Sequence, residues 1–186
     1  MTTVLVILPA GAEEIEAVTI PDMLVRAGAQ VTVASTTTEL VVTGSRGIPL
    51  AAHTLLDQVL SKTYDVVYLP GGGGSAKTHR DDARIQRLAS AQLASGRLLA
   101  VICAAPIALV PGKLCAGRRL TSYPGVRDQV EPFCAAWVDE KVVIDGNLVT
   151  SQGPGTAVAL GLVLIRLIAG ADVATQVASD MLVQPN

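Results

Sequence analysis

The stretch "RLLAVICAAPIALV", residues 97–110, decides the expected fold more than any other part of the chain. It opens with the apolar run Leu98–Ile102, which is typical of a β-strand buried on both faces. Two alanines and Pro106 follow Cys103, and proline is favoured in the first turn of a helix. The stretch therefore predicts a sharp strand-to-helix turn with the Cys103 thiol on the bend.

Strand and helix patterns alternate through the rest of the chain. Strands are expected at 3–8, at 30–35 and at 65–74, the last of which runs into a glycine loop. Hairpins are expected at 39–50 and 142–151. Helices are expected at 13–28, 81–96, 155–170 and 172–183. Pro21 is expected either to bend the first helix or to lie early in a regular part that begins near Ala17. This order predicts an α/β fold, with a mostly parallel sheet and helices on both faces.

The alternation also predicts where a functional site would lie. The chain has no linker and no internal repeat, so residues 1–186 are expected to form a single domain. In open parallel sheets, ligands bind beyond the carboxyl ends of the strands. We therefore expect the loops after Leu8, Leu69 and Ile102 to meet and form the site.

The composition limits the classes of protein that the chain can form. Half of its 186 residues are hydrophobic, 16% are charged and the net charge is −2, so a sizeable core is expected. This balance gives no basis for binding nucleic acid or an anionic membrane. The longest apolar segment, 157–170, is too short to span a bilayer and contains Arg166. With no signal-peptide pattern and three cysteines, an odd number, we expect a cytoplasmic protein with free thiols.

Cys103 has two interpretations. Free cysteine is among the most buried residue types, so residue type alone favours a structural thiol. Its position favours a reactive thiol, because an elbow presents a side chain at the top of a strand and free N–H groups at a helix start stabilise a thiolate. We give position more weight, and expect a thiol pKa below the ordinary value of about 8.5.

The stretch "GAEEIE", residues 11–16, supplies carboxyl groups near the same predicted site. Glu13 and Glu14 are explained by the favourable position of negative charge at a helix N-terminus. Glu16 has a further role if its side chain turns inward, because burial would raise its pKa and keep it protonated. It would then donate a hydrogen bond to the sulfur of Cys103 and favour the thiolate.

The glycine loop "LPGGGGS", residues 69–75, is a candidate for backbone hydrogen bonding to a reacting group. It lacks the lysine of a phosphate-binding loop and the glycine spacing of a dinucleotide site. Glycine does let backbone N–H groups approach a reacting centre closely. We expect an oxyanion hole from the N–H groups of Gly72 and Ala104, with Gly73 as a neighbouring binding position.

Four blocks in order, "LVILPAGAEEIEAV" (5–18), "DVVYLPGG" (65–72), "AVICAAPIAL" (100–109) and "LVTSQGPGTA" (148–157), resemble the ThiJ/PfpI family. The resemblance is strongest to the branch that contains bacterial YajL and the human Parkinson-associated deglycase. It implies a flavodoxin-like α/β sandwich and a homodimer. It also implies a reactive Cys103, a protonated Glu16 and backbone donors at Gly72 and Ala104.

Other matched positions surround this predicted centre. The resemblance places Arg26 and Arg46 around the site and the dimer contact, although solvated surface charge explains both equally well. Several relatives carry a histidine where this chain has Tyr123, which argues against a Cys–His hydrolase dyad. His79 is expected at the surface, in the loop that follows the glycines.

The resemblance implies two functions of different classes. In the first, a glyoxalase- or deglycase-like enzyme without cofactor or metal, the Cys103 thiolate adds to glyoxal, methylglyoxal or their adducts on glycated groups. Gly72 and Ala104 would hold the alkoxide, and Glu16 would move the proton. In the second, oxidation of Cys103 would alter a binding surface, as in a redox-regulated chaperone or a sensor of oxidative stress. Turnover by the reduced protein distinguishes the two.

Overall fold

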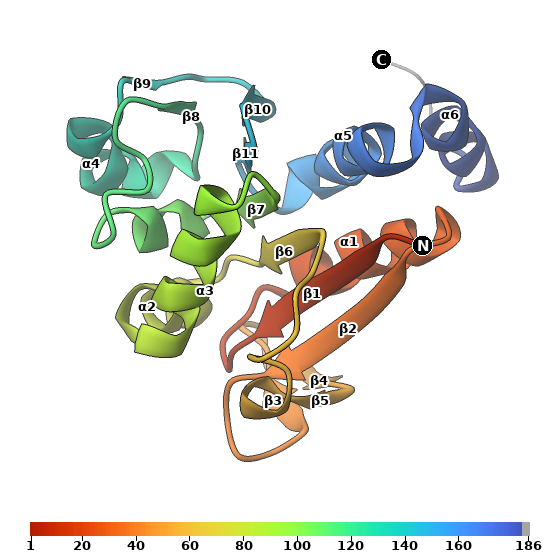
Figure 1. Ribbon diagram of the computed structural model, residues 1–186, viewed down its shortest axis with the longest axis horizontal. Coiled ribbons are helices and arrows are strands. Elements are labelled where there is room, and N and C mark those ends of the chain that lie inside the picture. Colours follow the sequence, from red (N-terminus) through yellow and green to blue (C-terminus); the bar gives the residue numbers. More distant parts are fainter. Residues whose placement is uncertain (184–186) are drawn as a thin grey trace.

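A seven-stranded sheet forms the centre of the computed structural model, which describes residues 1–183 (Figure 1). The strand order is β10-β11-β7-β6-β1-β2-β5, and every pairing is parallel except the antiparallel pair β10–β11. The strands are β1 (Thr3–Leu8), β2 (Gln30–Ser35), β5 (Thr54–Leu55), β6 (Val66–Leu69), β7 (Leu98–Ile102), β10 (Val142–Asp145) and β11 (Leu148–Ser151). The expected mostly parallel sheet is confirmed.

Helices cover both faces of this sheet. They are α1 (Glu14–Arg26), α2 (Gly73–Asp81), α3 (Ala83–Ala94), the short α4 (Arg127–Val130), α5 (Ala157–Ala169) and α6 (Ala171–Asp180). The crossover through α1 moves from β1 to β2, whereas the crossover through α3 moves the opposite way along the sheet, from β6 to β7. Because such crossovers are right-handed, α1 and α3 lie on opposite faces. α1 packs on α5, and α5 on α6 (Figure 1).

Two small sheets lie outside the central one. The expected hairpin forms from β3 (Val41–Thr43) and β4 (Pro49–Ala51), which pair antiparallel around a turn that includes Gly44. Strands β8 (Arg119–Leu120) and β9 (Ala136–Trp137) pair in parallel. Within residues 1–183, no helix has the length and apolar character needed to cross a bilayer.

Two elements near the glycine loop and the cysteine differ from the expected ones. Helix α2 begins at Gly73, where a loop was predicted, because Ser75, Ala76 and His79 recur at helical spacing and are buried. The segment after Cys103 is the short 3₁₀ helix η2 (Ala105–Leu109), not an α-helix, and all of its residues are buried. Pro21 lies inside α1, so the alternative in which the helix begins near Ala17 is wrong.

Candidate active site

Cys103 occupies a strained bend at the end of β7. Its φ angle is +63°, a left-handed conformation that is uncommon for residues other than glycine. Its N–H donates to the carbonyl of Ser151 at 2.9 Å, and its carbonyl accepts from the N–H of Tyr123 at 2.7 Å. The predicted bend is therefore present, and hydrogen bonds fix it on both sides. The residue as a whole is 9% exposed.

The three glutamates at the start of α1 have three different tasks. Glu13 is the N-cap, and its side chain accepts the N–H of Glu16 at 3.0 Å. Glu14 holds the turn of the β3–β4 hairpin, accepting from the Oγ of Ser45 at 3.0 Å and from the N–H of Arg46 at 2.6 Å. This second role was not foreseen from the sequence. Glu16 points inward and is completely buried.

The Glu16 carboxyl and the Cys103 thiol both lie against Gly71, close enough for each to change the pKa of the other. One carboxyl oxygen, Oε2, accepts the N–H of Gly71 at 2.8 Å. The other, Oε1, has no hydrogen-bond partner in the described part of the chain. The N–H groups of Gly72 and Ala104 act on the sulfur of Cys103 in the direction that lowers its pKa. The loops after β1, β6 and β7 thus meet, as the sequence predicted.

Glycine is required where the loop after β6 passes between the two side chains. A Cβ atom on Gly71 would lie 2.5 Å from the Cβ of Cys103 and 2.6 Å from Oε2 of Glu16. Gly72 has a φ angle of +95°, and a Cβ there would lie 2.2 Å from the carbonyl oxygen of Gly11. The glycines therefore allow two backbone N–H groups to reach the pair.

Burial dominates the ionisation of the pair. It raises the pKa of Glu16 to about 7, against the hydrogen bonds from Gly71 and Cys103. Burial and then the Glu16 carboxylate raise the pKa of the Cys103 thiol to about 12, although the N–H groups of Gly72 and Ala104 act in the other direction. The predicted low thiol pKa is therefore wrong for a thiol facing an ionised Glu16. Desolvation outweighs the few N–H groups at the start of a short 3₁₀ helix.

The remaining expected site residues lie at different distances from the pair. Tyr123 joins Cys103 through its backbone N–H, and its side chain is half exposed. Gly73 is exposed at the first position of α2. Arg46 is exposed on the hairpin turn held by Glu14. Arg26 pairs with Asp22 at the far end of α1, about 15 Å along the helix axis from Glu16.

The prediction that His79 lies in a surface loop is wrong. His79 is completely buried on α2, where its Nε2 lies 3.0 Å from the Oγ of Ser75 and 3.0 Å from the carbonyl oxygen of Pro70. Burial lowers its pKa to about 4. The signal that could have located it is the helical spacing of Ser75, Ala76 and His79 behind the glycines.

Glu16 and His79 make opposite contributions to stability as the pH changes. The folded-state pKa of Glu16 is raised from 4.5 to about 7, so its contribution is present below pH 4.5 and is lost as pH rises through 7. The pKa of His79 is lowered from 6.5 to about 4, so its contribution is present above pH 6.5 and is lost as pH falls through 4.

Glu16→Gln should therefore make the protein more sensitive to acid. Between about pH 6.5 and about pH 4.5 it should lose up to about 3 kcal/mol more stability than the wild type, because His79 then titrates unopposed. Urea unfolding followed by circular dichroism at each pH measures the difference. His79→Gln should shift the profile the other way, and identical profiles for all three proteins would contradict these two pKa shifts.

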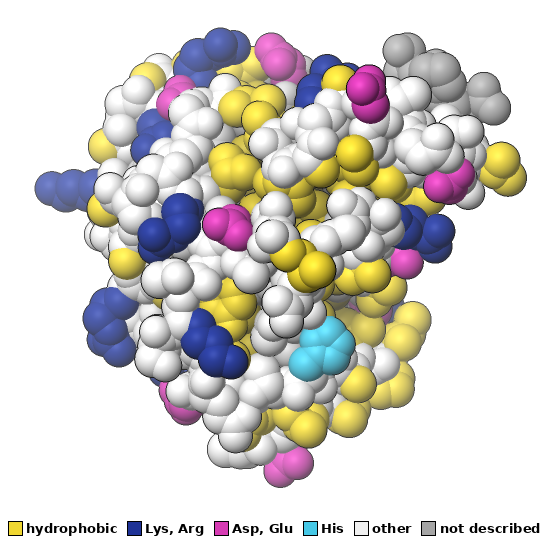
Figure 2. Space-filling view, turned by 45° about the vertical axis from the view of Figure 1, so that its right-hand side comes forward, with side chains coloured by type: hydrophobic (Ala, Val, Ile, Leu, Met, Phe, Trp, Pro, Cys, Tyr) yellow, Lys and Arg dark blue, Asp and Glu magenta, His cyan; other side chains and the backbone are white. Residues whose placement is uncertain are grey.

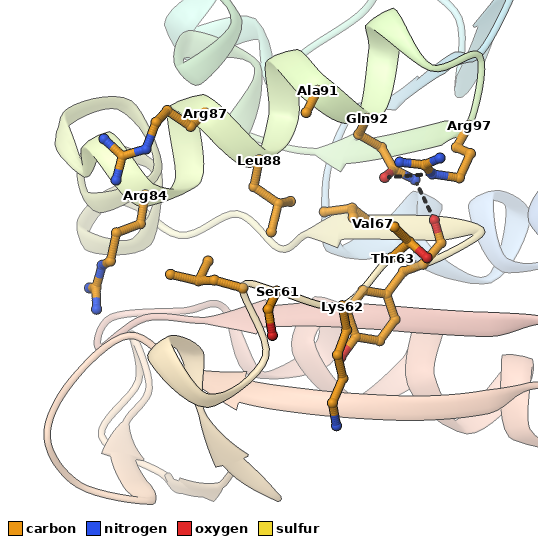
Figure 3. Close-up of a pocket in the computed structure, with 12 residues that line it drawn as sticks. Ser61, Lys62, Thr63, Val67, Arg84, Arg87, Leu88, Ala91, Gln92 and Arg97 are labelled. Carbon is orange, nitrogen blue, oxygen red and sulfur yellow. Dashed lines mark hydrogen bonds between the residues drawn. The ribbon is translucent and has the colours of Figure 1, made fainter.

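A hollow of about 340 Å³ lies elsewhere, between α3 and the loop before β6 (Figure 3). Val67 and Leu88 line it together with several arginines, of which Arg84 is already paired with the carboxylates of Asp57 and Asp82. It includes Arg97, which directly precedes β7, so it lies at the opposite end of that strand from the cysteine.

Within residues 1–183, no group of three or more His, Cys, Asp or Glu side chains could hold a metal ion.

The fold and the site define a flavodoxin-like α/β protein with a cysteine on the elbow after a central strand. The chain belongs to the DJ-1/PfpI family, whose model matches residues 2–167. It is 41% identical to protein dj-1beta of Drosophila melanogaster over 182 residues, which cover 98% of this chain and 97% of that protein. It is also 35% identical to the glutathione-independent glyoxalase DJR-1.2 of Caenorhabditis elegans, covering 87% of this chain and 86% of that protein.

Solved structures agree with this assignment. The crystal structure of Drosophila melanogaster DJ-1beta matches with a TM-score of 0.96 at 40% identity and covers 99% of both chains. The structure described as Toxoplasma gondii DJ-1, oxidized, matches with a TM-score of 0.93 at 36% identity and covers 98% of both chains. Against DJ-1 homologs A and B of Arabidopsis thaliana, the chain spans 47% and 42% of the longer proteins.

Proposed function

We propose that this chain is a cysteine-dependent, cofactor-independent enzyme that converts glyoxal and methylglyoxal, or their adducts on glycated groups, to 2-hydroxy acids. One observation carries the proposal: the Cys103 thiol, the buried Glu16 carboxyl and the N–H groups of Gly72 and Ala104 converge around Gly71. This arrangement provides a nucleophile, a proton carrier and donors for an oxyanion. The glyoxalase named in Caenorhabditis elegans supports the substrate class.

The pair is proposed to react with one proton shared between its two side chains. Above about pH 7, where the first proton has left, the remaining proton lies either on sulfur or on Glu16. Burial and the Glu16 carboxylate raise the pKa of the thiol to about 12, so the remaining proton lies on sulfur. The proposed role of Oε1 of Glu16, which has no hydrogen-bond partner in the described part of the chain, is to take this proton as the sulfur attacks, while the N–H groups of Gly72 and Ala104 stabilise the charge that develops on sulfur.

The proposed reaction adds water to a 1,2-dicarbonyl compound. The sulfur of Cys103 bonds to the aldehyde carbon, and the carbonyl oxygen becomes an alkoxide held by the N–H groups of Gly72 and Ala104. Glu16 protonates the alkoxide, and its carboxylate then moves a proton from this carbon to the neighbouring carbon through an enediol. The resulting thioester is hydrolysed by water, which releases the hydroxy acid and restores the thiol.

The direct test is product formation by the reduced protein. Purified protein is incubated with methylglyoxal in a metal-chelating buffer without glutathione, and lactate is measured with lactate dehydrogenase. The initial rate should rise in proportion to protein concentration, and glyoxal should give glycolate. No lactate above the protein-free blank would overturn the proposal.

We also propose a cytoplasmic location, because all three cysteines are free thiols.

A second candidate function is a redox sensor or a redox-regulated chaperone. It is favoured by the difference between the three cysteines: Cys103 lies in the site, whereas Cys115 is completely buried and hydrogen-bonds the carbonyls of Leu109 and Phe133. Neither Cys115 nor Cys134 hydrogen-bonds Cys103 among the residues described. One structural relative is described as oxidized.

Graded peroxide should therefore add two oxygen atoms to Cys103 before it changes the other thiols. The thiolate takes one oxygen from each of two peroxide molecules, forming a sulfenate and then a sulfinate, and each peroxide leaves as water. The proposed partners of a sulfinate oxygen are the N–H groups of Gly72 and Ala104, which also favour negative charge on the sulfur. Peptide mass spectrometry gives the order of oxidation. A disulfide from Cys103 to Cys115 or Cys134 as the main product would contradict this prediction.

A homodimer is the assembly that we propose. Ile15, Val18 and Val25 on α1 are 53%, 54% and 57% exposed, and Val41 and Ile48 on the neighbouring hairpin are exposed as well. A hollow of about 350 Å³ lies between α1, β2 and this hairpin. In Figure 2, hydrophobic side chains gather across the middle and lower right of the view. Exposed apolar surface of this extent is typical of a contact with another chain.

Val18→Asp is expected to dissociate the dimer, because it places a charge in the centre of the apolar contact. Light scattering after gel filtration should give twice 19.2 kDa for the wild type and a single chain mass for the variant. Ile144→Asp, at an exposed isoleucine on β10, is the matched control and should remain dimeric. A dimeric Val18→Asp protein would place the interface elsewhere.

A further inference from the structure

We infer that His79 is a positioning residue for the candidate site: through the carbonyl of Pro70, its ring holds the glycine loop that presents backbone N–H groups to Glu16 and Cys103. The expected effect of His79 on turnover rests on the proposed function. Its expected effect on the position of the glycine loop rests only on the hydrogen bonds of that loop. His79 itself does not touch the reacting atoms.

The contacts form a closed triangle behind the glycine loop. The Oγ of Ser75 donates to the carbonyl oxygen of Pro70 at 3.0 Å, and Nε2 of His79 lies 3.0 Å from the same oxygen and 3.0 Å from Oγ. The side chains of Ser75 and His79 are both completely buried. The next residue along the chain is Gly71, whose N–H donates to Oε2 of Glu16.

The hydrogen positions in the triangle follow from the acceptor. A carbonyl oxygen only accepts, so Nε2 donates to Pro70 in the tautomer that carries the ring proton on Nε2, and we infer this tautomer for neutral His79. Nδ1 is then a bare acceptor, and it is buried with no partner among residues 1–183. The nearby charged group is Asp82, which interacts with His79 electrostatically. Leaving Nδ1 unpaired is costly.

The triangle is not a second nucleophilic centre. A serine and a histidine 3.0 Å apart resemble a hydrolase pair, but neither side chain is accessible to a substrate. The Ser75 hydroxyl is already committed as a donor to Pro70, and Nδ1 lacks the carboxylate partner that orients a catalytic histidine.

The loop needs such an anchor because glycine restricts the backbone so little. Residues 71–74 are four consecutive glycines, and Gly72 adopts a φ angle of +95°. Two donors on the carbonyl of Pro70 fix the peptide that precedes Gly71. Gln86 connects α2 to η2, the 3₁₀ helix that follows Cys103, because its Nε2 donates to the carbonyls of both His79 and Ala108.

The test measures the cysteine directly, in a background where Cys115 and Cys134 are serine. His79→Leu should slow alkylation of Cys103 by iodoacetamide at neutral pH about fivefold, because the N–H of Gly72 no longer holds the thiolate in place. His79→Gln keeps a donor near the position of Nε2 and should restore most of the rate. Gln92→Leu is the matched control, since Gln92 is also buried and donates to backbone carbonyls, those of Tyr64 and Leu98.

Turnover of methylglyoxal separates failure of this inference from failure of the proposed function. If the wild type forms lactate, His79→Leu should lower kcat about fivefold with KM unchanged, and Gln92→Leu should leave kcat unchanged. If the wild type forms no lactate, slower alkylation confined to His79→Leu still supports the positioning role. Alkylation that is unchanged in His79→Leu, or slowed equally by Gln92→Leu, would overturn it.

Discussion

Replacing Cys103 with alanine should lower the rate of lactate formation from methylglyoxal by about 10³-fold or more. The substitution removes the atom that forms the covalent bond to the substrate carbon. The N–H groups of Gly72 and Ala104 remain, but they then face no adduct oxygen to stabilise. Initial rates at saturating and limiting methylglyoxal, in the absence of glutathione, give kcat and kcat/KM for both proteins.

Two controls make this result specific to the elbow. Cys115→Ala and Cys134→Ala remove the other free thiols and should keep wild-type turnover, since neither residue hydrogen-bonds Cys103. Alanine at position 103 retains the left-handed backbone, whose φ angle is +63°, and deletes one buried sulfur, so thermal unfolding should show a folded protein. Activity of Cys103→Ala within tenfold of the wild type would place the chemistry on another group.

The central sheet could be predicted because its strands are continuous apolar runs, which are stable only when both faces are buried. Residues such as Val4 to Ile7 and Leu99 to Ile102 are completely buried, and continuous apolar runs of this length are typical of parallel strands. Once their order alternates with helices, the carboxyl ends of β1, β6 and β7 must lie together. The positions of Glu16, Gly72 and Cys103 followed from this geometry.

Other features depend on packing that the sequence does not display. Helix α2 starts among glycines, which disfavour helix, and it is stabilised by burying Ser75, Ala76 and His79 against η2. The local pattern of polar residues therefore indicated a loop. The His79 side chain and its contact with Pro70 became visible once this helix was placed.

The ionisation of the cysteine was misjudged for a related reason. A helix start and a nearby acid both suggested a stabilised thiolate, and both are local features of the sequence. The deciding quantity is the desolvation of Cys103 and Glu16 once three loops close over them, and this raises both pKa values. Glu16 thus becomes the group whose protonation state controls the thiolate.

Glu16→Gln is the variant that separates formation of a thiolate from movement of a proton. Glutamine is close in shape to glutamate, so its amide oxygen can accept the N–H of Gly71 and its NH₂ group can donate toward the sulfur of Cys103. Alkylation of Cys103 by iodoacetamide should therefore persist. The amide neither gives up nor takes up a proton in the working pH range. The steps that lead from the alkoxide through the enediol to the thioester therefore lose their general acid and base.

Lactate formation by Glu16→Gln should consequently fall by about 10²–10⁴-fold, the usual contribution of a positioned general acid or base. In the wild type, activity should rise with pH through about 7, because the first proton of the pair leaves there and the reactive singly protonated form appears. The variant should lack this step, because an amide does not titrate. Rates measured from about pH 5 to about pH 9, with alkylation followed in parallel, test both statements. If Glu16→Gln turns over within a few-fold of the wild type and keeps the same pH profile, the proton is carried by another group, and the proposed role of Glu16 is wrong.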